Sequence, residues 1–203
     1  MEHFNVRKMA LAAVETTQFV PAWGAARLRA MVENRPDWCL SRQRTWGVPI
    51  PVFFCEKCNH PYANAEVMFK VADRMEKEGG LEAYHKYSSA DFIGDHKCEK
   101  CGHSEFAKGQ DILDVWFDSG VCHAAVQSRR KGLKFPADIY LEGSDQHRGW
   151  FQTSLLSALA SRGEAPFKTL LTHGFVTDTK GRKMSKSLGN VVVPAEVTQK
   201  SGA

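Results

Sequence analysis

The most concentrated chemistry in the sequence is the basic loop at residues 181–190. It places Lys183 and Lys186 three residues apart and interleaves them with Ser185 and Ser187. Ammonium groups and hydroxyls in this arrangement present point charges and hydrogen-bond donors to a phosphate-bearing ligand. A solvated basic loop would have the same composition. The loop by itself therefore leaves phosphate binding and simple solvation both open.

A second group of polar residues follows a short apolar run at 138–141, which we expect to form a buried strand. Glu142, Asp145 and Gln146 offer acceptors and a donor suited to ribose hydroxyls or an ammonium group. Gly143 permits close approach of the backbone. Polar residues between the carboxyl end of a strand and a helix lie where open α/β sheets bind ligands. A helix capped by Asp145 is the alternative, and it explains only one of these residues.

The next strand along the chain leads into the basic loop. We expect this strand at 169–176, with His173 near its end and a turn at 177–181. The carboxyl ends of two strands, one followed by acidic and the other by basic residues, then converge. The sequence therefore predicts a site of nucleotide size at this edge of a sheet.

Four of the six cysteines form two pairs in which two residues separate the thiols. The first and second pairs are Cys55 with Cys58 and Cys98 with Cys101. Each pair has the knuckle form that brings two thiolates onto a tetrahedral zinc ion. Asn59 and Gly102 follow the pairs, and both residue types tolerate the left-handed conformation of a knuckle. We expect a structural zinc site, closed by four thiolates and without an open position for catalysis.

Two tryptophans and two arginines surround a polar centre at Trp38, Arg42, Arg44 and Trp46. Tryptophan with arginine can stack on and pair with a nucleotide or an RNA end. Packed tryptophans at the edge of a core are the other interpretation, and the sequence leaves both open. Further along, residues 111–120 alternate acidic with apolar types, which predicts a strand that leads into a loop. Other elements are expected as helices at 25–32, 64–77 and 152–160, with an extended segment at 48–54.

The bulk composition is that of a soluble globular protein of one or two domains, with 203 residues, 43% hydrophobic and 25% charged. The net charge of +4 permits a polyanionic partner without arguing for one. No apolar run approaches the ~20 residues of a membrane span. The first residues lack the layout of a secretory signal, so we expect a cytoplasmic protein with reduced or metal-bound cysteines. Residues 1–35 suggest no compact unit, and both ends look cut, as in a fragment.

These residues resemble class I aminoacyl-tRNA synthetases, and specifically the isoleucyl type found in bacteria. The motif Lys-Met-Ser-Lys-Ser at 183–187 is shared by several synthetases of this class. The stretch from Leu141 to Phe151 is more discriminating, because the valyl, leucyl and methionyl types carry different residues there. The resemblance runs from about Pro21 to the end of the sequence. It rests also on the stretches 37–44, 114–120 and 173–175.

The resemblance implies an enzyme that activates isoleucine with ATP and Mg²⁺ and then transfers it to tRNA(Ile). By the family's pattern, Glu142 would hold the amino group of the aminoacyl-adenylate, and His173 would lie beside it. Gly143, Asp145 and Gln146 would bind its sugar and backbone portions. Trp116 and Trp150 would line the isoleucine pocket. The ATP phosphates would meet Lys183, Lys186 and the neighbouring hydroxyls of Ser185 and Ser187.

The implied fold class is α/β: the C-terminal half of a Rossmann-type parallel sheet, interrupted by a small zinc-knuckle insertion. We expect residues 1–35 to be the exit of an editing insertion with a linker, and residues 36–54 to be a catalytic segment. The zinc insertion is expected at 55–106 and the Rossmann half at 107–203. The family's His-x-Gly-His half lies outside this sequence, so we expect the chain alone to be inactive. The completed enzyme is expected to be a monomer without membrane contact.

Two other readings remain open. One is a non-catalytic, zinc-bearing fragment that binds RNA. The other is a different nucleotidyl-transferring enzyme of the same superfamily, such as a valyl synthetase.

Overall fold

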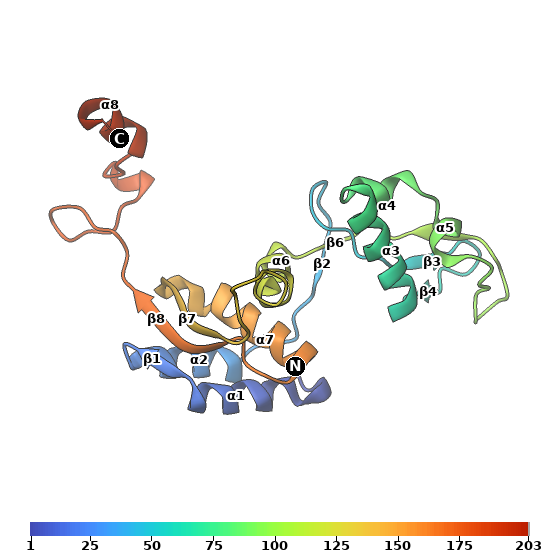
Figure 1. Ribbon diagram of the computed structural model, residues 1–203, viewed down its shortest axis with the longest axis horizontal. Coiled ribbons are helices and arrows are strands. Elements are labelled where there is room, and N and C mark those ends of the chain that lie inside the picture. The colour runs from blue at the N-terminus through green and yellow to red at the C-terminus, as the bar shows by residue number, and fades with distance from the viewer. Residues whose placement is uncertain (203) are drawn as a thin grey trace. The chain divides into compact units, whose positions relative to one another are not determined.

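The computed structural model describes residues 1–202, so only Ala203, the end of the expected Rossmann half, lies outside the described residues. The chain divides into two compact units (Figure 1). Unit 1 joins Met1–Arg35 to the segment that begins at Cys122, and unit 2 is Pro36–Val121. Within the described part of the chain, no helix has the length and apolar character needed to cross a membrane.

Unit 1 is an α/β structure built on a three-stranded parallel sheet with the strand order β1-β8-β7. Its strands are β1 (Gln18–Val20), β7 (Ala137–Gly143) and β8 (Phe167–His173). Its helices are α1 (Val6–Thr16), α2 (Trp23–Glu33), α7 (Trp150–Arg162) and α8 (Pro194–Ser201). Shorter helical turns are η1 (His3–Asn5), η2 (His123–Gln127), η3 (Ser144–His147) and η4 (Lys186–Leu188). The expected α/β fold with a parallel sheet is confirmed.

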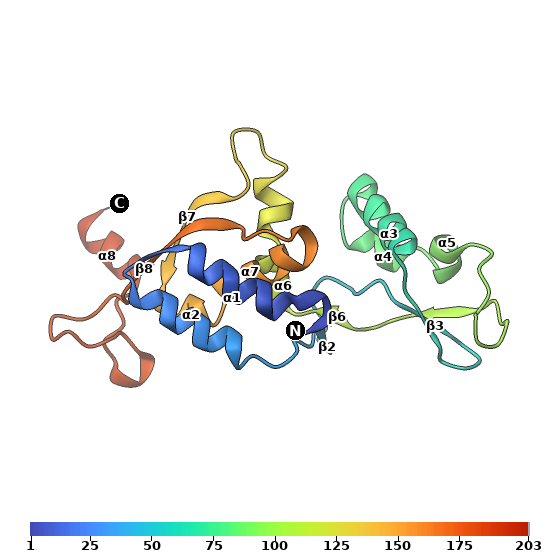
Figure 2. The ribbon, with the colours of Figure 1, turned by 90° about the horizontal axis from the view of Figure 1, so that it is seen from below.

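The core of unit 1 lies on one face of this sheet. Tyr140 and Leu170 are paired across β7 and β8 and are both buried. They pack in one cluster with Leu28 of α2, Val14 of α1 and Leu155 of α7. Figure 2 shows α1 and α2 lying side by side. Ile139 and Leu141 of β7 alternate with Tyr140 and point to the other face, where both are exposed.

Residues 1–35, which suggested no compact unit in the sequence, are part of unit 1 in the structure. Val14, Leu28 and Val32 are buried in the core of unit 1. The strand β1 pairs in parallel with β8, so that Phe19 lies opposite Leu170. The helix expected at 25–32 is α2, and α1 and α2 are buried by packing against each other, α7 and the sheet.

Unit 2 consists of short strands and helices. The strands are β2 (Ser41–Arg42), β3 (Phe53–Cys55), β4 (Pro61–Tyr62), β5 (Phe106–Lys108) and β6 (Ile112–Leu113). The helices are α3 (Ala65–Glu78), α4 (Glu82–Lys86), α5 (Ser89–Ile93) and α6 (Val115–Gly120). The sheet β4-β3-β5 and the pair β2-β6 are antiparallel. Unit 2 contains the whole of the expected zinc insertion at 55–106, and the division into functional segments stays a prediction.

The second core surrounds the cysteines of unit 2. Phe53, Val67 and Phe92 are almost completely buried and pack with Cys55 and Cys98. The helix expected at 64–77 is α3, which begins after Asn64 because the side chain of Asn64 accepts a hydrogen bond from the backbone N–H of Val67. It ends at Gly79 in the left-handed conformation, as the glycine pair predicts.

The expected strand and loop at 111–120 is corrected by the structure. Only Ile112 and Leu113 are extended, and α6 follows at once. The carboxylate of Asp114 accepts a hydrogen bond from the backbone N–H of Trp116 (3.1 Å), which caps the helix. Trp116 therefore lies on a helix rather than in a loop.

Candidate functional site

The two strands that were predicted to end in polar residues are neighbours in unit 1. The strands β7 and β8 are parallel neighbours, and Gly143 is paired with His173 at their carboxyl ends. Glu142 and His173 are both exposed there. This edge of the sheet has the position at which open α/β sheets bind ligands.

Gly143 has a specific steric reason to be glycine. A Cβ atom at this position would lie 2.8 Å from Oδ1 of Asp145 and 3.6 Å from the ring of His173. Phe175 would also be in contact, at 3.9 Å. The absent side chain therefore lets a carboxylate, an imidazole and a phenyl ring surround one point of the backbone.

Gln146 connects the strand end to the helix that follows. Its Oε1 atom accepts a hydrogen bond from the backbone N–H of Trp150 (2.9 Å), and its Nε2 atom donates to Oδ2 of Asp145 (3.0 Å). Because α7 has no side-chain cap from its own N-cap residue Gly149, this contact supplies the missing acceptor. Gln146 thus fixes the start of α7 and orients Asp145.

Trp150 stacks on the ring of Tyr140, with 4.0 Å between ring centroids and 5° between planes. The hydroxyl of Tyr140 accepts a hydrogen bond from Gln127 (3.2 Å) and contacts the hydroxyl of Ser154 (3.2 Å). Burial raises the pKa of Tyr140, so the hydroxyl is neutral. The indole of Trp150 therefore packs on the ring of Tyr140, and that ring is fixed by the contacts of its hydroxyl group.

An isolated antiparallel bridge between Thr177 and Lys183 closes a hairpin at the start of the lysine loop. The ammonium group of Lys183 lies 3.8 Å from the centroid of the Phe175 ring, within the range of a cation–π contact. Phe175 thus links Lys183 to the surroundings of Gly143. Lys186 is exposed on η4, where its chemistry is available to a ligand.

Ser185 and Ser187 belong to the turn that carries Lys186. Their hydroxyls are 3.1 Å apart, and Oγ of Ser185 accepts a hydrogen bond from the backbone N–H of Leu188 (3.2 Å). The backbone N–H of Ser185 donates in turn to the side chain of Asn190 (2.9 Å). These contacts give the turn a defined backbone conformation.

The carboxylate of Asp178, which precedes the loop in the sequence, binds several groups of the loop. It accepts hydrogen bonds from the backbone N–H groups of Lys180 and Arg182 (both 2.9 Å) and forms an ion pair with the Arg182 guanidinium (2.9 Å). It also accepts from the amide of Asn190 (3.0 Å), whose carbonyl holds Ser185. The amide of Asn190 and the backbone N–H of Arg182 lower the pKa of Asp178 to about 2. The hydrogen bond between Asn190 and Asp178 therefore holds the two ends of this segment together.

The four predicted zinc ligands come together in unit 2. All four sulfur atoms of Cys55, Cys58, Cys98 and Cys101 lie within 4.8 Å of one another. The Sγ atoms of Cys55 and Cys101 are 3.6 Å apart, as are those of Cys58 and Cys98. Zn–S bonds of about 2.3 Å in a tetrahedron place sulfurs about 3.8 Å apart. The donor set and its spacing fit a four-thiolate zinc ion.

The two cysteine pairs have matching backbone geometry. The N–H groups of Asn59 and Gly102 each donate to the carbonyl of the first cysteine in their pair, Cys55 and Cys98, at 2.8 Å. Both residues have positive φ, 53° and 72°. The left-handed conformation predicted for each knuckle is therefore present.

Two thiols of the cluster have opposite pKa shifts: burial raises the pKa of Cys58 to about 12, whereas the pKa of Cys98 is lowered. Burial raises the pKa of the Cys98 thiol, but the backbone N–H groups of Cys101 and Lys100 outweigh that effect and lower it to about 7. Backbone amides that point at sulfur are expected where a thiolate binds a metal ion.

Trp116 and Trp150, the two expected walls of an isoleucine pocket, belong to different units. Trp116 is exposed on α6 of unit 2, and Trp150 is half-buried on α7 of unit 1. Their pairing in one pocket stays a prediction.

Sequence reasoning missed three residues that position the site: Asp178, Asn190 and Tyr140. Asp178 and Asn190 flank the loop symmetrically, so turn chemistry could have indicated both. Tyr140 sits in an apolar run and gave no signal, because its polar partners come from Gln127 and Ser154.

With this geometry established, the family is clear. The model of the family described as tRNA synthetases class I (I, L, M and V) matches residues 1–203, and the chain belongs to this family. A solved LeuRS of Agrobacterium radiobacter, in a ternary complex with tRNA and LeuAMS, has a similar fold with a TM-score of 0.52. It is 30% identical, and the match covers 82% of this chain and 23% of the LeuRS chain.

Among curated proteins, the chain is similar to isoleucine–tRNA ligases. It is 54% identical to that of Syntrophotalea carbinolica, over 100% of this chain and 22% of the relative. The ligase of Caldanaerobacter subterraneus is 55% identical over 97% of this chain and 21% of the relative. That of Aquifex aeolicus is 54% identical over 98% and 21%. The chain therefore spans about a fifth of the length of these relatives.

Proposed function

We propose that this chain is part of an isoleucine–tRNA ligase, which joins isoleucine to ATP as isoleucyl-adenylate and then transfers it to tRNA(Ile). The relatives at 50–55% identity carry this name and match the chain along nearly all of its length. The observation that carries the proposal is the parallel pairing of β7 with β8. This pairing supports the proposal that Glu142, at the end of β7, and the basic loop at 181–190 belong to a single binding site.

Amino acid activation needs positioning and charge stabilisation more than proton transfer. A carboxylate oxygen of isoleucine attacks the α-phosphorus of ATP, the bond to the β-phosphate oxygen breaks, and pyrophosphate leaves with its negative charge. Lys183 and Lys186 would offset this charge, with the hydroxyls of Ser185 and Ser187 as donors. ATP would enter with Mg²⁺, which would supply positive charge to offset that of the phosphates.

The residues at the strand ends have matching roles in this proposal. Glu142, as an exposed carboxylate, would bind the ammonium group of isoleucine. Gly143, Asp145 and Gln146 would bind the sugar and the backbone portion of the adenylate, with His173 beside it. Trp150 would form one wall of the side-chain pocket, and Trp116 another. We also propose a structural zinc ion at the four cysteines, and a monomeric enzyme that works in the cytoplasm.

The test uses a chimera, the isoleucine–tRNA ligase of Syntrophotalea carbinolica with this chain in place of its matching segment. The chimera should catalyse isoleucine-dependent exchange between pyrophosphate and ATP, and the chain alone should not. Lys186→Ala should lower this exchange by ~10²-fold or more, the scale of losing one charge-stabilising donor. Lys180→Ala, in the turn just before the loop and outside the motif, is the matched control and should change it by less than about 3-fold.

Exchange that persists in Lys186→Ala, or that falls equally in the Lys180→Ala control, would contradict the proposed role of the loop. A folded chimera that activates valine or leucine in preference to isoleucine would contradict the proposed substrate.

A further inference from the structure

The segment at 43–47, here called the tip, carries an arginine and a tryptophan that have no role in the site described above. Of the four arginines and tryptophans at 38–46, the two that precede the tip are engaged inside unit 2. The indole N–H of Trp38 donates to Asp114 (2.9 Å), and the guanidinium of Arg42 forms an ion pair with the same carboxylate (2.6 Å). Arg44 and Trp46 remain.

Arg44 and Trp46 both face solvent. Among the described residues Arg44 has no ion-pair partner, and its guanidinium donates only to the carbonyl of its neighbour Gln43 (3.1 Å). Trp46 is 87% exposed, the highest value among the large hydrophobic side chains of the described residues. Its indole therefore offers an exposed aromatic face.

The tip is held firmly at its base. Gly47 has a φ of 151°, and a Cβ there would lie 2.4 Å from the side chain of Ile112. Pro49 forms a bridge to the same Ile112, and the side chain of Gln43 donates to Asp111 (3.1 Å). The tip therefore presents Arg44 and Trp46 from a fixed turn.

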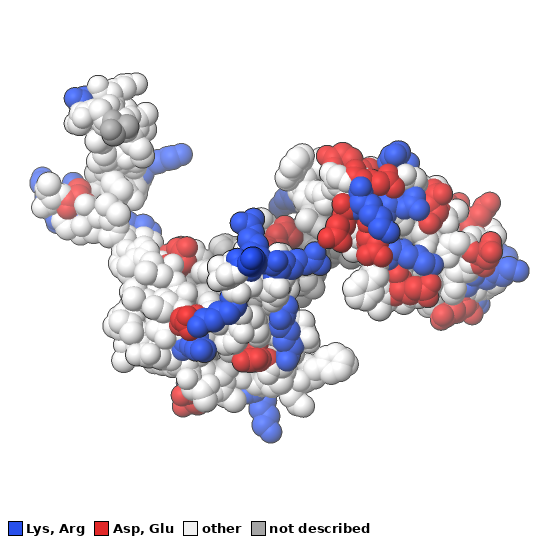
Figure 3. Space-filling model, viewed as in Figure 1, with Lys and Arg blue, Asp and Glu red and all other residues white. Residues whose placement is uncertain are grey.

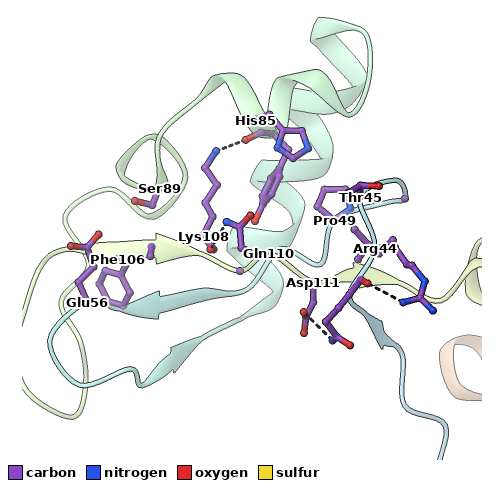
Figure 4. A pocket seen from close by; sticks show the side chains of 16 residues that line it. Arg44, Thr45, Pro49, Glu56, His85, Ser89, Phe106, Lys108, Gln110 and Asp111 are labelled. Carbon is purple, nitrogen blue, oxygen red and sulfur yellow. Dashed lines mark hydrogen bonds between the residues drawn. The ribbon is translucent and has the colours of Figure 1, made fainter.

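Hollows lie on both sides of the tip, and Arg44 lines both. The larger, of about 830 Å³, is lined by polar groups that include Lys108 and Gln110 (Figure 4). In that view Lys108 and Arg44 lie on opposite sides of the hollow. Tyr84, which is 2% exposed, also lines it, and its hydroxyl has no hydrogen-bond partner among the described residues. The smaller hollow, of about 360 Å³, has an apolar wall that includes Trp46, Leu81 and Val115.

This combination matches a single-stranded nucleic acid. A tryptophan face and an apolar wall accept an unstacked base, while a guanidinium and amide donors bind phosphate and sugar. Elsewhere on unit 2, positive and negative side chains are interspersed (Figure 3), as in the pair of Lys70 with Glu66 at 2.9 Å. Such a mixed surface does not favour a polyanion. Carboxylates also line the hollows at the tip, but Asp111 accepts a hydrogen bond from Gln43 and Asp114 is paired with Arg42. Arg44 keeps an unpaired charge among the described residues, two positions from Trp46.

We propose that the tip binds the single-stranded 3′ end of the tRNA, with a base on Trp46 and a phosphate on Arg44. This inference rests on the proposed function and adds a contact that amino acid activation does not require. It predicts that the tip contributes to tRNA binding and to charging, and not to adenylate formation.

The experiment measures binding of two RNAs to the chimera: intact tRNA(Ile) and the same tRNA without its single-stranded 3′ nucleotides. Trp46→Ala and Arg44→Glu should each weaken binding of the intact tRNA by about 10-fold or more, the scale of one stacked base or one lost phosphate contact. Neither should change binding of the shortened tRNA by more than about 2-fold. Trp46→Phe, which keeps a stacking face, should recover most of the affinity.

Lys77→Glu is the matched control, because it makes the same charge change at an exposed position of α3. It should leave binding of both RNAs unchanged. Equal weakening for both RNAs, or none, would overturn the proposal. So would a matching loss of tRNA-free pyrophosphate exchange, which would indicate that the tip packs against another part of the enzyme. Absent exchange in the unmutated chimera would instead count against the proposed function.

Discussion

At the scale of single residues, Asp178 has the largest set of contacts in the lysine loop. One carboxylate binds two backbone N–H groups, one guanidinium and the amide of Asn190. Lys183 and Lys186 are exposed, so their positions depend on the backbone that this carboxylate organises. We infer that Asp178 is a positioning residue for the lysines.

Replacement of this carboxylate tests its role. Asp178→Ala in the chimera should lower kcat for pyrophosphate exchange by about 10-fold or more, with a smaller effect on the KM for isoleucine, because the loop lysines lose their fixed geometry. Asp178→Asn, which keeps one acceptor, should be intermediate. A uniform change in the KM values of both substrates with unchanged kcat would contradict the positioning role.

The pH dependence of the loop follows from the same carboxylate. Its folded-state pKa of about 2 lies below the ordinary value of 3.8, so its stabilising contribution is complete above pH 3.8. It is lost as the pH falls through about 2. A carbon NMR titration of labelled aspartates should find one carboxyl group with a midpoint far below 3.8, and this signal should be absent from Asp178→Asn. A midpoint near 3.8 would contradict the network.

The stacked pair of Tyr140 and Trp150 gives a second prediction at this scale. Trp150→Ala should raise the KM for isoleucine about 10-fold or more and change the KM for ATP much less, because the indole is proposed as a wall of the amino acid pocket. Tyr140→Phe keeps the stacking and should have a small effect. Equal rises in both KM values would indicate a scaffolding tryptophan instead.

At the scale of elements, the cysteine knuckles were predictable and α6 was not. A knuckle is local: cysteine spacing, a residue with positive φ and one backbone hydrogen bond define it, so Cys55–Asn59 and Cys98–Gly102 could be read directly. The residues 115–120 have a strand-like pattern, and they become helical because Asp114 caps them while it holds Trp38 and Arg42. Those partners lie more than seventy residues away in the sequence.

The two cysteine knuckles also predict the metal content of the protein. Dialysed protein should contain about one zinc ion per chain by elemental analysis, because two complete knuckles supply four thiolates. Cys98→Ser should lower the zinc content and destabilise unit 2, whose core includes Cys98 and Phe53. Cys39→Ser, at an exposed cysteine outside the cluster, should keep both. Protein without zinc and of unchanged stability would contradict the assignment.

At the scale of the whole molecule, the chain forms two units with separate cores. The parallel strands β7 and β8 and the helix between them followed from the apolar pattern of the sequence. The return of residues 1–35 to the sheet did not, because β1 joins β8 across some 150 residues without a local signal.

Because the two units have separate cores, we expect a core substitution in one unit to destabilise that unit alone. Leu170→Ala, at a completely buried position of unit 1, should destabilise that unit by about 2–5 kcal/mol. It should leave zinc content unchanged, because the cysteines belong to unit 2. Hydrogen exchange measured on the chain can follow both cores. Loss of zinc in Leu170→Ala would show that the two units do not fold separately.

The most direct test of the account compares isoleucine, valine and leucine as substrates for pyrophosphate exchange by the chimera. The account predicts the highest kcat/KM for isoleucine. For valine, a missing methylene should lower it by about 10- to 200-fold, a range for which isoleucine-activating synthetases are themselves a standard example. Leucine, whose branch point differs, should be weaker than isoleucine. Equal or faster exchange with valine or leucine would contradict the assignment of this chain to an isoleucine–tRNA ligase.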